Sequence, residues 1–121
     1  MKMLDRFFDA LRTQDWEKLA GCLAENVERT GPYLDVVRGK RAYVEFLSKV
    51  MPTLRNYELR VHRSRRLDDG SAMVELSETL DLDGVRTEVP EVLVFDFDAG
   101  GRILRVDIYV KNQPDAAGRN R

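Results

Sequence analysis

Residues 72–97 read AMVELSETLDLDGVRTEVPEVLVFDF, and this stretch predicts a β-hairpin with an acid on the apolar face of each strand. Side chains alternate between the two faces of a strand, so residues 72–82 and 85–97 each place a largely apolar set on one side. Glu78 interrupts the first set and Glu91 interrupts the second. A carboxyl group on such a face must be paired, hydrated or protonated, which makes these two glutamates the first candidates for chemistry.

The turn between the two strands fixes their register. Asp83-Gly84 is typical of a two-residue hairpin turn, and such a turn pairs Leu82 with Val85. In this register Glu78 and Glu91 lie on the same buried face, one diagonal step apart. The sequence therefore predicts a carboxyl pair inside the protein.

Two further strands extend the hairpin into a meander. The two-residue period begins near residue 56 and predicts strands over 56–68 and 102–111, with turns at Asp69-Gly70 and Ala99-Gly100-Gly101. Pairing Asp68 with Ser71 places Arg63 on the concave face, in the same row as Glu91. An arginine there would be within reach of the two acids.

The N-terminal half predicts three helices. Leu4, Phe7, Phe8 and Leu11 follow helical spacing, and the same spacing recurs over 16–23 after Asp15, a plausible N-cap. A short extended stretch over 27–33 precedes a third helix, which begins after Gly39 and ends near Pro52. The expected fold class is α+β, with a conical, curved antiparallel sheet packed on three N-terminal helices.

The composition indicates one ordinary globular domain, expected over residues 1–112, with a flexible polar tail over 113–121. The chain has 121 residues, 20 basic and 21 acidic, so no strong net charge favours nucleic acid or an anionic membrane. It has neither an apolar run of the roughly 20 residues that span a bilayer nor a signal-peptide pattern. Cys22, the single cysteine, suits a reducing compartment, and we expect a cytoplasmic protein.

The order of these elements resembles the nuclear transport factor 2-like superfamily over residues 2–112. Gln14-Asp15-Trp16 lies between the first two helices, Gly31-Pro32 precedes the third, and Gly101-Arg102-Ile103 opens the last strand. Within the superfamily the chain is similar to the SnoaL-like polyketide cyclases and ketosteroid isomerases. This resemblance implies a cone-shaped domain, a deep apolar pocket and a dimer. Because superfamily members include isomerases, cyclases, dehydratases, epoxide hydrolases and binding domains, the fold alone does not decide the function.

The catalytic groups of two of these relatives are missing here. Phe7 stands where the isomerases carry their oxyanion tyrosine, Gly31 where they carry the general-base aspartate, and Leu93 where they carry a protonated aspartate. In the epoxide hydrolases an Arg-x-Asp pair matches Thr79 to Asp81, and the acid of the last strand falls on Ile108. Thr79 has no charge to replace the arginine, and Ile108 has no carboxylate. Asp81 keeps the carboxylate but is expected on the outer face.

Glu78 and Glu91 instead occupy positions that are apolar in the isomerases, and we interpret them as a new acid–base site. Two acids in a low-dielectric cavity do not both ionise, so one can hold a proton while its neighbour acts as the base. This chemistry suits a cofactor-independent isomerase or cyclase acting on a hydrophobic carbonyl compound. The residues expected to bind the substrate are Phe7, Leu11, Tyr33, Arg63, Leu76, Leu80, Leu93, Phe95, Val106 and Ile108.

Three alternatives remain open at this stage. Arg63 could hold both glutamates in a purely structural ion cluster. The cone could bind a small apolar molecule without turning it over. The outer sheet face, with Val92, Val94 and Tyr109, could form a homodimer interface.

The remaining candidates favour ordinary structural roles. His62 falls on the outer face by strand parity, and neither it nor Cys22 has a partner at the spacing of a metal site, so we predict no metal and no cofactor. The arginine-rich run over 60–66 alternates between faces and lacks aromatic residues on one side. It indicates a solvated strand rather than a nucleic-acid site.

Overall fold

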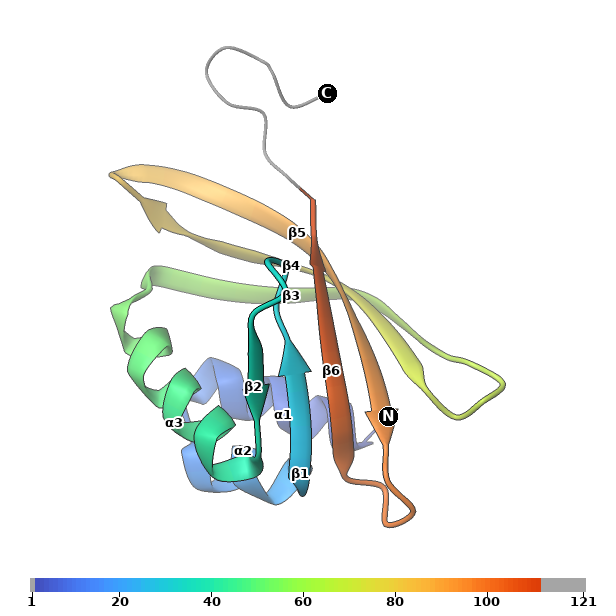
Figure 1. The fold of residues 1–121 in the computed structure, drawn as a ribbon. Helices are drawn as coiled ribbons and strands as arrows, with labels where there is room; N and C mark the ends of the chain where they lie inside the picture. The colour runs from blue at the N-terminus through green and yellow to red at the C-terminus, as the bar shows by residue number, and fades with distance from the viewer. Residues whose placement is uncertain (1, 112–121) are drawn as a thin grey trace.

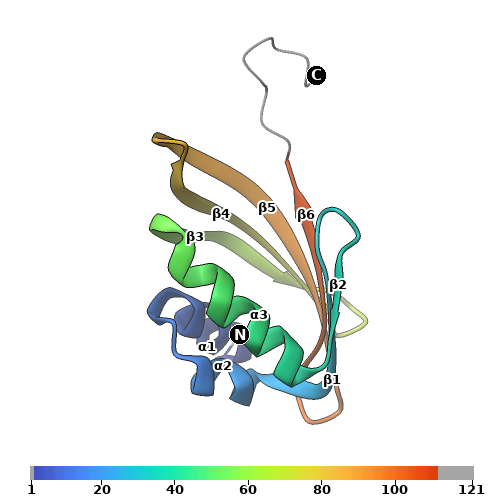
Figure 2. The same ribbon diagram turned by 60° about the vertical axis from the view of Figure 1, so that its left-hand side comes forward.

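Three helices cover the concave side of one curved sheet, as Figure 1 and Figure 2 show from two directions. This is the α+β fold predicted from the sequence. The computed structural model describes residues 2–111, so the tail predicted for 113–121 lies outside the described residues. No helix in residues 2–111 is long and apolar enough to cross a membrane.

The helices follow the predicted order and bury their apolar stripes. Asp15 caps the second helix, since its side chain accepts a hydrogen bond from the Lys18 amide at 3.1 Å. A single 3-10 turn containing Pro52 ends the third helix. The elements are α1 (Lys2–Thr13), α2 (Trp16–Cys22), α3 (Lys40–Val50) and η1 (Met51–Thr53).

The sheet has six strands in the spatial order β2-β1-β6-β5-β4-β3. The four C-terminal strands form the predicted antiparallel meander. The sheet is nevertheless mixed rather than wholly antiparallel, because β1 runs parallel to β6 and pairs antiparallel with the short β2. The strands are β1 (Leu23–Thr30), β2 (Val36–Arg38), β3 (Arg55–Arg66), β4 (Ala72–Leu82), β5 (Val85–Phe97) and β6 (Ile103–Val110).

The β4–β5 hairpin has the predicted register. Leu82 pairs with Val85, and both turn residues adopt left-handed backbone angles, with φ of 50° at Asp83 and 78° at Gly84. Such angles match the twist of the flanking strands. The predicted diagonal placement of the two glutamates is therefore confirmed, with Glu91 opposite Leu76.

The predicted register of β3 on β4, which pairs Asp68 with Ser71, is wrong along the whole strand. Val61 lies opposite Leu76, but the register shifts at a β-bulge before Arg63, which lies opposite Glu75. The extra residue reverses the alternation of side chains, so Arg63 forms an ion pair with Glu75 on the outer face. Arg63 therefore does not join Glu78 and Glu91.

Aromatic rings at the centre of the core lock α1 onto the sheet. Phe95 of β5 packs edge-to-face against Phe7 and Phe8 of α1, with ring centroids 5.5 Å and 5.9 Å apart. These rings are buried together with aliphatic side chains from β1, β4 and β6. These ring contacts pack α1 directly against β5 and so fix the position of this helix over the sheet.

Two glycine-to-alanine substitutions should change stability in opposite directions. Gly84→Ala should lower the free energy of unfolding by about 1 kcal/mol, because an L side chain is strained at its positive φ. Gly21→Ala should raise it by roughly 0.5–1 kcal/mol, because Gly21 lies in α2 and an added Cβ meets no atom within 4 Å. Urea denaturation measures both values, and shifts of the same sign would contradict this assignment of the turn.

Candidate functional site

A cavity of about 180 Å³ lies between the helices and the sheet and is lined by both glutamates, of which Glu91 is buried and Glu78 half-buried. Its walls come from both helical and strand elements, and most of them are aromatic or aliphatic. The residues lining it are Phe7, Phe8, Leu11, Arg29, Tyr43, Phe46, Leu47, Val50, Met51, Leu54, Leu59, Leu76, Glu78, Glu91, Leu93 and Ile108. The polar groups are few and concentrated, as in a small-molecule site.

Glu78 accepts a short hydrogen bond from a neighbouring phenol. The Tyr57 hydroxyl on β3 donates to Glu78 Oε2 on β4 at 2.5 Å. Burial, together with the charge of Glu78 and this hydrogen bond, raises the pKa of Tyr57. The phenol therefore stays protonated and remains a donor to the carboxylate.

Glu91 holds a proton at neutral pH. Its side chain is buried, with 8% of the residue exposed. Burial, with the hydrogen bond and charge of Glu78 as further causes, raises the pKa of Glu91 to about 10, while the Arg29 charge acts weakly the other way. Glu91 thus favours its neutral form and lies beside the second carboxyl group of the cavity.

Arg29 contributes the one cationic side chain among the cavity-lining residues. It is buried on β1, with 9% of the residue exposed, and its guanidinium lies 4.8 Å from the centre of the Phe46 ring. Arg29 Nη1 donates to Asp35 Oδ2 at 2.7 Å. That ion pair lowers the pKa of Asp35 and balances the buried charge of Arg29.

The structure brings together part of the predicted set of site residues. Five predicted wall residues line the cavity with the two glutamates: Phe7, Leu11, Leu76, Leu93 and Ile108. Phe95 and Val106 are fully buried in the core, and Leu80 lies farther along β4, opposite Thr87. These three side chains support the fold and lie outside the cavity lining.

Tyr33 and Arg63 lie away from the acid pair. Tyr33 is 88% exposed and lines a separate surface hollow with Leu34 and Tyr109. Tyr33, expected among the substrate-binding residues, therefore does not line the cavity, because the β1–β2 loop turns this side chain outward. Arg63, on the outer face, cannot form the structural ion cluster that the sequence left open.

The outer sheet face carries the other residues weighed in the sequence. His62 is exposed there, as predicted, and its Nε2 lies 2.8 Å from the Ser77 hydroxyl. Val92 pairs with Tyr109, which is 62% exposed, and both line a broad hollow on this face. The homodimer expected from this surface stays a prediction.

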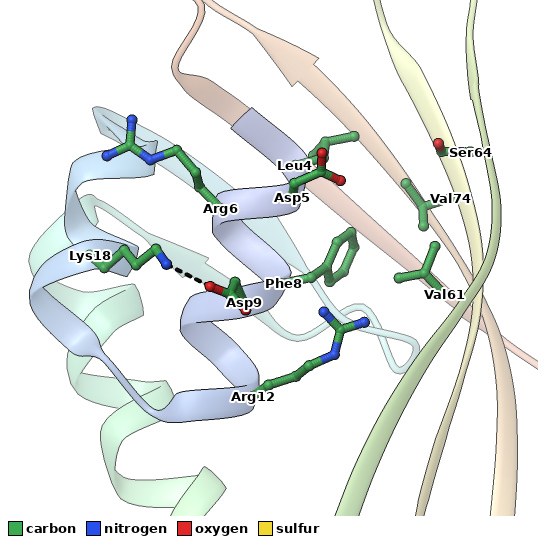
Figure 3. Close-up of a pocket in the computed structure, with 10 residues that line it drawn as sticks. All are labelled: Leu4, Asp5, Arg6, Phe8, Asp9, Arg12, Lys18, Val61, Ser64 and Val74. Carbon is green, nitrogen blue, oxygen red and sulfur yellow. Dashed lines mark hydrogen bonds and ion pairs between the residues drawn. The ribbon is translucent and has the colours of Figure 1, made fainter. Parts of the chain in front are cut away.

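A second hollow, between α1 and the β3–β4 edge, has a different character. Figure 3 shows Phe8 facing Val61, and the Lys18–Asp9 ion pair at the outer rim. This hollow, of about 360 Å³, is open and rimmed by several exposed charges. None of its ionisable side chains is buried, whereas Glu91 is, so the cavity with Glu78 and Glu91 is the stronger candidate site.

Two polar residues of the site were missed in the sequence, although each carried a usable signal. Arg29 lies two residues after the buried Val27 along β1, so it faces inward by the same parity rule that identified the glutamates. Tyr57 falls on the concave face by the parity of residues 56–68, but the sequence pattern does not connect it with Glu78. The pairing of Leu59 with Glu78 brings Tyr57 close, and this register depends on the bulge in β3.

The family model described as a SnoaL-like domain matches residues 4–106. The chain belongs to the SnoaL-like domain family. This confirms the resemblance drawn from the order of elements, and it relates the SnoaL-like domain described here to isomerases and cyclases of the nuclear transport factor 2-like fold. No curated protein matches the sequence significantly.

Solved structures support the same fold for this SnoaL-like domain. A candidate ketosteroid isomerase from Kribbella flavida DSM 17836 is 26% identical, with a TM-score of 0.77 over 93% of this chain and 77% of its own. A candidate SnoaL-like polyketide cyclase from Shewanella denitrificans OS-217 is 12% identical, with a TM-score of 0.78 over 90% and 88%. A Mycobacterium tuberculosis protein solved with estradiol-17beta-hemisuccinate is 16% identical, with a TM-score of 0.75 over 88% and 89%.

Replacing Glu91 by glutamine should change how the stability of this SnoaL-like domain depends on pH. Folding raises the pKa of Glu91 from its ordinary value of 4.5 to about 10, so the folded state binds more protons between these values. Wild-type stability therefore falls as pH rises through this range, by at most about 1.4 kcal/mol per pH unit. A glutamine side chain cannot ionise, so the stability of Glu91→Gln relative to wild type should increase with pH.

Denaturation by urea at several pH values measures this difference. Glu75→Gln is the matched control, because Glu75 lies on the outer face of β4 and its pKa is lowered by Arg63. This control should show no such gain with rising pH. Parallel curves for wild type and Glu91→Gln between about pH 5 and pH 9 would contradict a buried proton on Glu91.

Proposed function

We propose that this protein is a cofactor-independent acid–base catalyst, an isomerase or cyclase, that moves a proton on a small hydrophobic carbonyl compound. The observation that carries the proposal is the placement of Glu78 and Glu91 together in the wall of a largely apolar cavity of about 180 Å³, where burial raises the pKa of Glu91. Membership of the SnoaL-like family, with its relation to isomerases and cyclases, supports the same class of reaction.

In the proposed reaction Glu78 is the base. Its carboxylate removes the proton from the carbon next to the carbonyl, and the electron pair of that bond moves onto the carbonyl oxygen. Glu91, which holds a proton, donates a hydrogen bond to the reacting molecule and can return a proton to it. Tyr57 holds the Glu78 carboxylate in place through the 2.5 Å hydrogen bond.

The apolar walls support both binding and proton transfer. Aromatic and aliphatic side chains exclude water, which strengthens the electrostatic interactions of the acid pair. Removing a proton from carbon needs a base of suitable pKa and stabilisation of the charge that develops on oxygen. The cavity combines a carboxylate, a neutral acid and a guanidinium for these tasks.

Hydrogen–deuterium exchange tests the proposal without knowledge of the natural substrate. Wild-type protein in D₂O should accelerate exchange of the α-hydrogens of small cyclic ketones such as cyclohexanone, measured by NMR. Glu78→Gln should lower the exchange rate by at least about 100-fold, because the base is removed. Glu75→Gln changes the same residue type on the outer face of the same strand and should retain the wild-type rate.

A non-catalytic pocket for an apolar ligand is the second candidate, favoured by the predominance of hydrophobic walls. The two candidates differ in a measurable way, because a binding protein consumes nothing and exchanges nothing. If the wild-type protein binds cyclic ketones but accelerates exchange for none of them, the catalytic proposal is wrong and the non-catalytic pocket is supported.

We also propose that the chain forms a homodimer through the outer sheet face. Val92 and Val94 lie on this face of β5 beside the exposed Tyr109, and they offer an apolar strip to a second copy. Val94→Arg would place like charges on both copies and should convert the dimer to a monomer in sedimentation velocity. A variant as dimeric as the wild type would exclude this surface.

A further inference from the structure

Arg29 lines the cavity and has guanidinium N–H groups that make no hydrogen bond to the described residues. A guanidinium carries five N–H groups, and within residues 2–111 its one hydrogen bond is that from Nη1 to Asp35. The described residues contain no sealed side-chain nitrogen or oxygen without a partner, so the other guanidinium nitrogens that lack a bond must reach open space. Arg29 is also one of the residues that line the cavity, where such a donor would meet a bound molecule.

The Asp35 carboxylate holds this guanidinium from the side of the β1–β2 loop. Asp35 folds back beneath Gly31, whose amide donates to the Asp35 carbonyl at 2.8 Å. A Cβ at residue 31 would lie only 2.4 Å from Asp35 Oδ1, so any side chain there would displace the carboxylate. Gly31 therefore provides the room that lets Asp35 orient Arg29.

The charge of Arg29 reaches the reacting groups. It lowers the pKa of Glu91, against the larger effect of burial, and it lowers that of Tyr43 in the same way. Stacking on Phe46 limits the orientations of the guanidinium plane. A fixed, desolvated cation beside a proton-transfer pair suits the stabilisation of negative charge on oxygen.

We propose that Arg29 is a catalytic residue that binds the carbonyl oxygen of the substrate and stabilises it as an enolate, with Asp35 as its positioning residue. This inference rests on the proposed function. When Glu78 takes the α-proton it becomes neutral, and the electron pair of the broken C–H bond places a negative charge on the carbonyl oxygen. The net charge of the cavity does not change, but the negative charge moves from the Glu78 carboxylate to the substrate oxygen that Arg29 holds.

The test uses two measurements on the full chain. The first is the α-hydrogen exchange of cyclohexanone. The second is equilibrium binding of 4-nitrophenolate, a stable oxyanion, followed by its absorbance at a pH where it is ionised in water. Binding of the oxyanion needs no turnover, so it reports on Arg29 even if no ketone is a substrate.

Arg29→Met should lower the kcat of exchange by about 100-fold with a smaller change in KM, since the donor acts mainly on the developing charge. It should also weaken 4-nitrophenolate binding by about tenfold or more. Arg63→Met is the matched control, because it removes the same charge from an ion pair on the outer face, and it should leave both measurements unchanged. Should Arg29→Met fail to fold, the double variant Arg29→Met/Asp35→Asn removes both members of the ion pair and should show the same losses.

The outcomes separate the two proposals. Exchange and oxyanion binding in Arg29→Met equal to those of Arg63→Met would overturn the role of Arg29. Absence of exchange in the wild type, with oxyanion binding that still depends on Arg29, would overturn the proposed function while supporting Arg29 as the oxyanion-binding residue.

Discussion

The register of β4 on β5 is the constraint on which the site depends. Strand side chains alternate with a period of two, so a slip of one residue would carry Glu78 or Glu91 to the outer face and separate the pair. The Asp83-Gly84 turn prevents that slip through its two left-handed residues. A surface turn thus determines the chemistry of a cavity several residues away along each strand.

The parts of the fold that follow from local rules could be predicted from the sequence, including the three helices, the Asp15 cap and the β4–β5 register. The bulge in β3 could not, because residues 60–66 are almost uniformly polar on both faces and give no parity signal on either side of His62. The parallel pairing of β1 with β6 joins segments far apart in the sequence, which no local pattern specifies. The inward position of Arg29 can be predicted from strand parity. Its ion pair with Asp35 cannot, because that contact depends on the folded loop at Gly31.

The interior distributes its charges so that each has a nearby group to stabilise it. The Glu78 carboxylate has Tyr57 and the protonated Glu91, while the Arg29 guanidinium has Asp35. An unpaired charge in such surroundings would cost several kcal/mol. The acid pair and the ion pair are therefore two separately balanced units, and a ligand that enters between them meets a donor side and an acceptor side.

The bulge in β3 also has a consequence for the length of the chain. His62 is an extra residue in the ladder, with Val61 opposite Leu76 and Arg63 opposite Glu75, which are themselves adjacent. Deletion of His62 would restore regular pairing without moving any side chain from one face to the other. Deletion of a residue between Tyr57 and Val61 would instead change which side chains face inward on one side of the gap. Within this strand, His62 therefore marks a position where evolution or design can shorten the chain and leave the lining of the cavity intact.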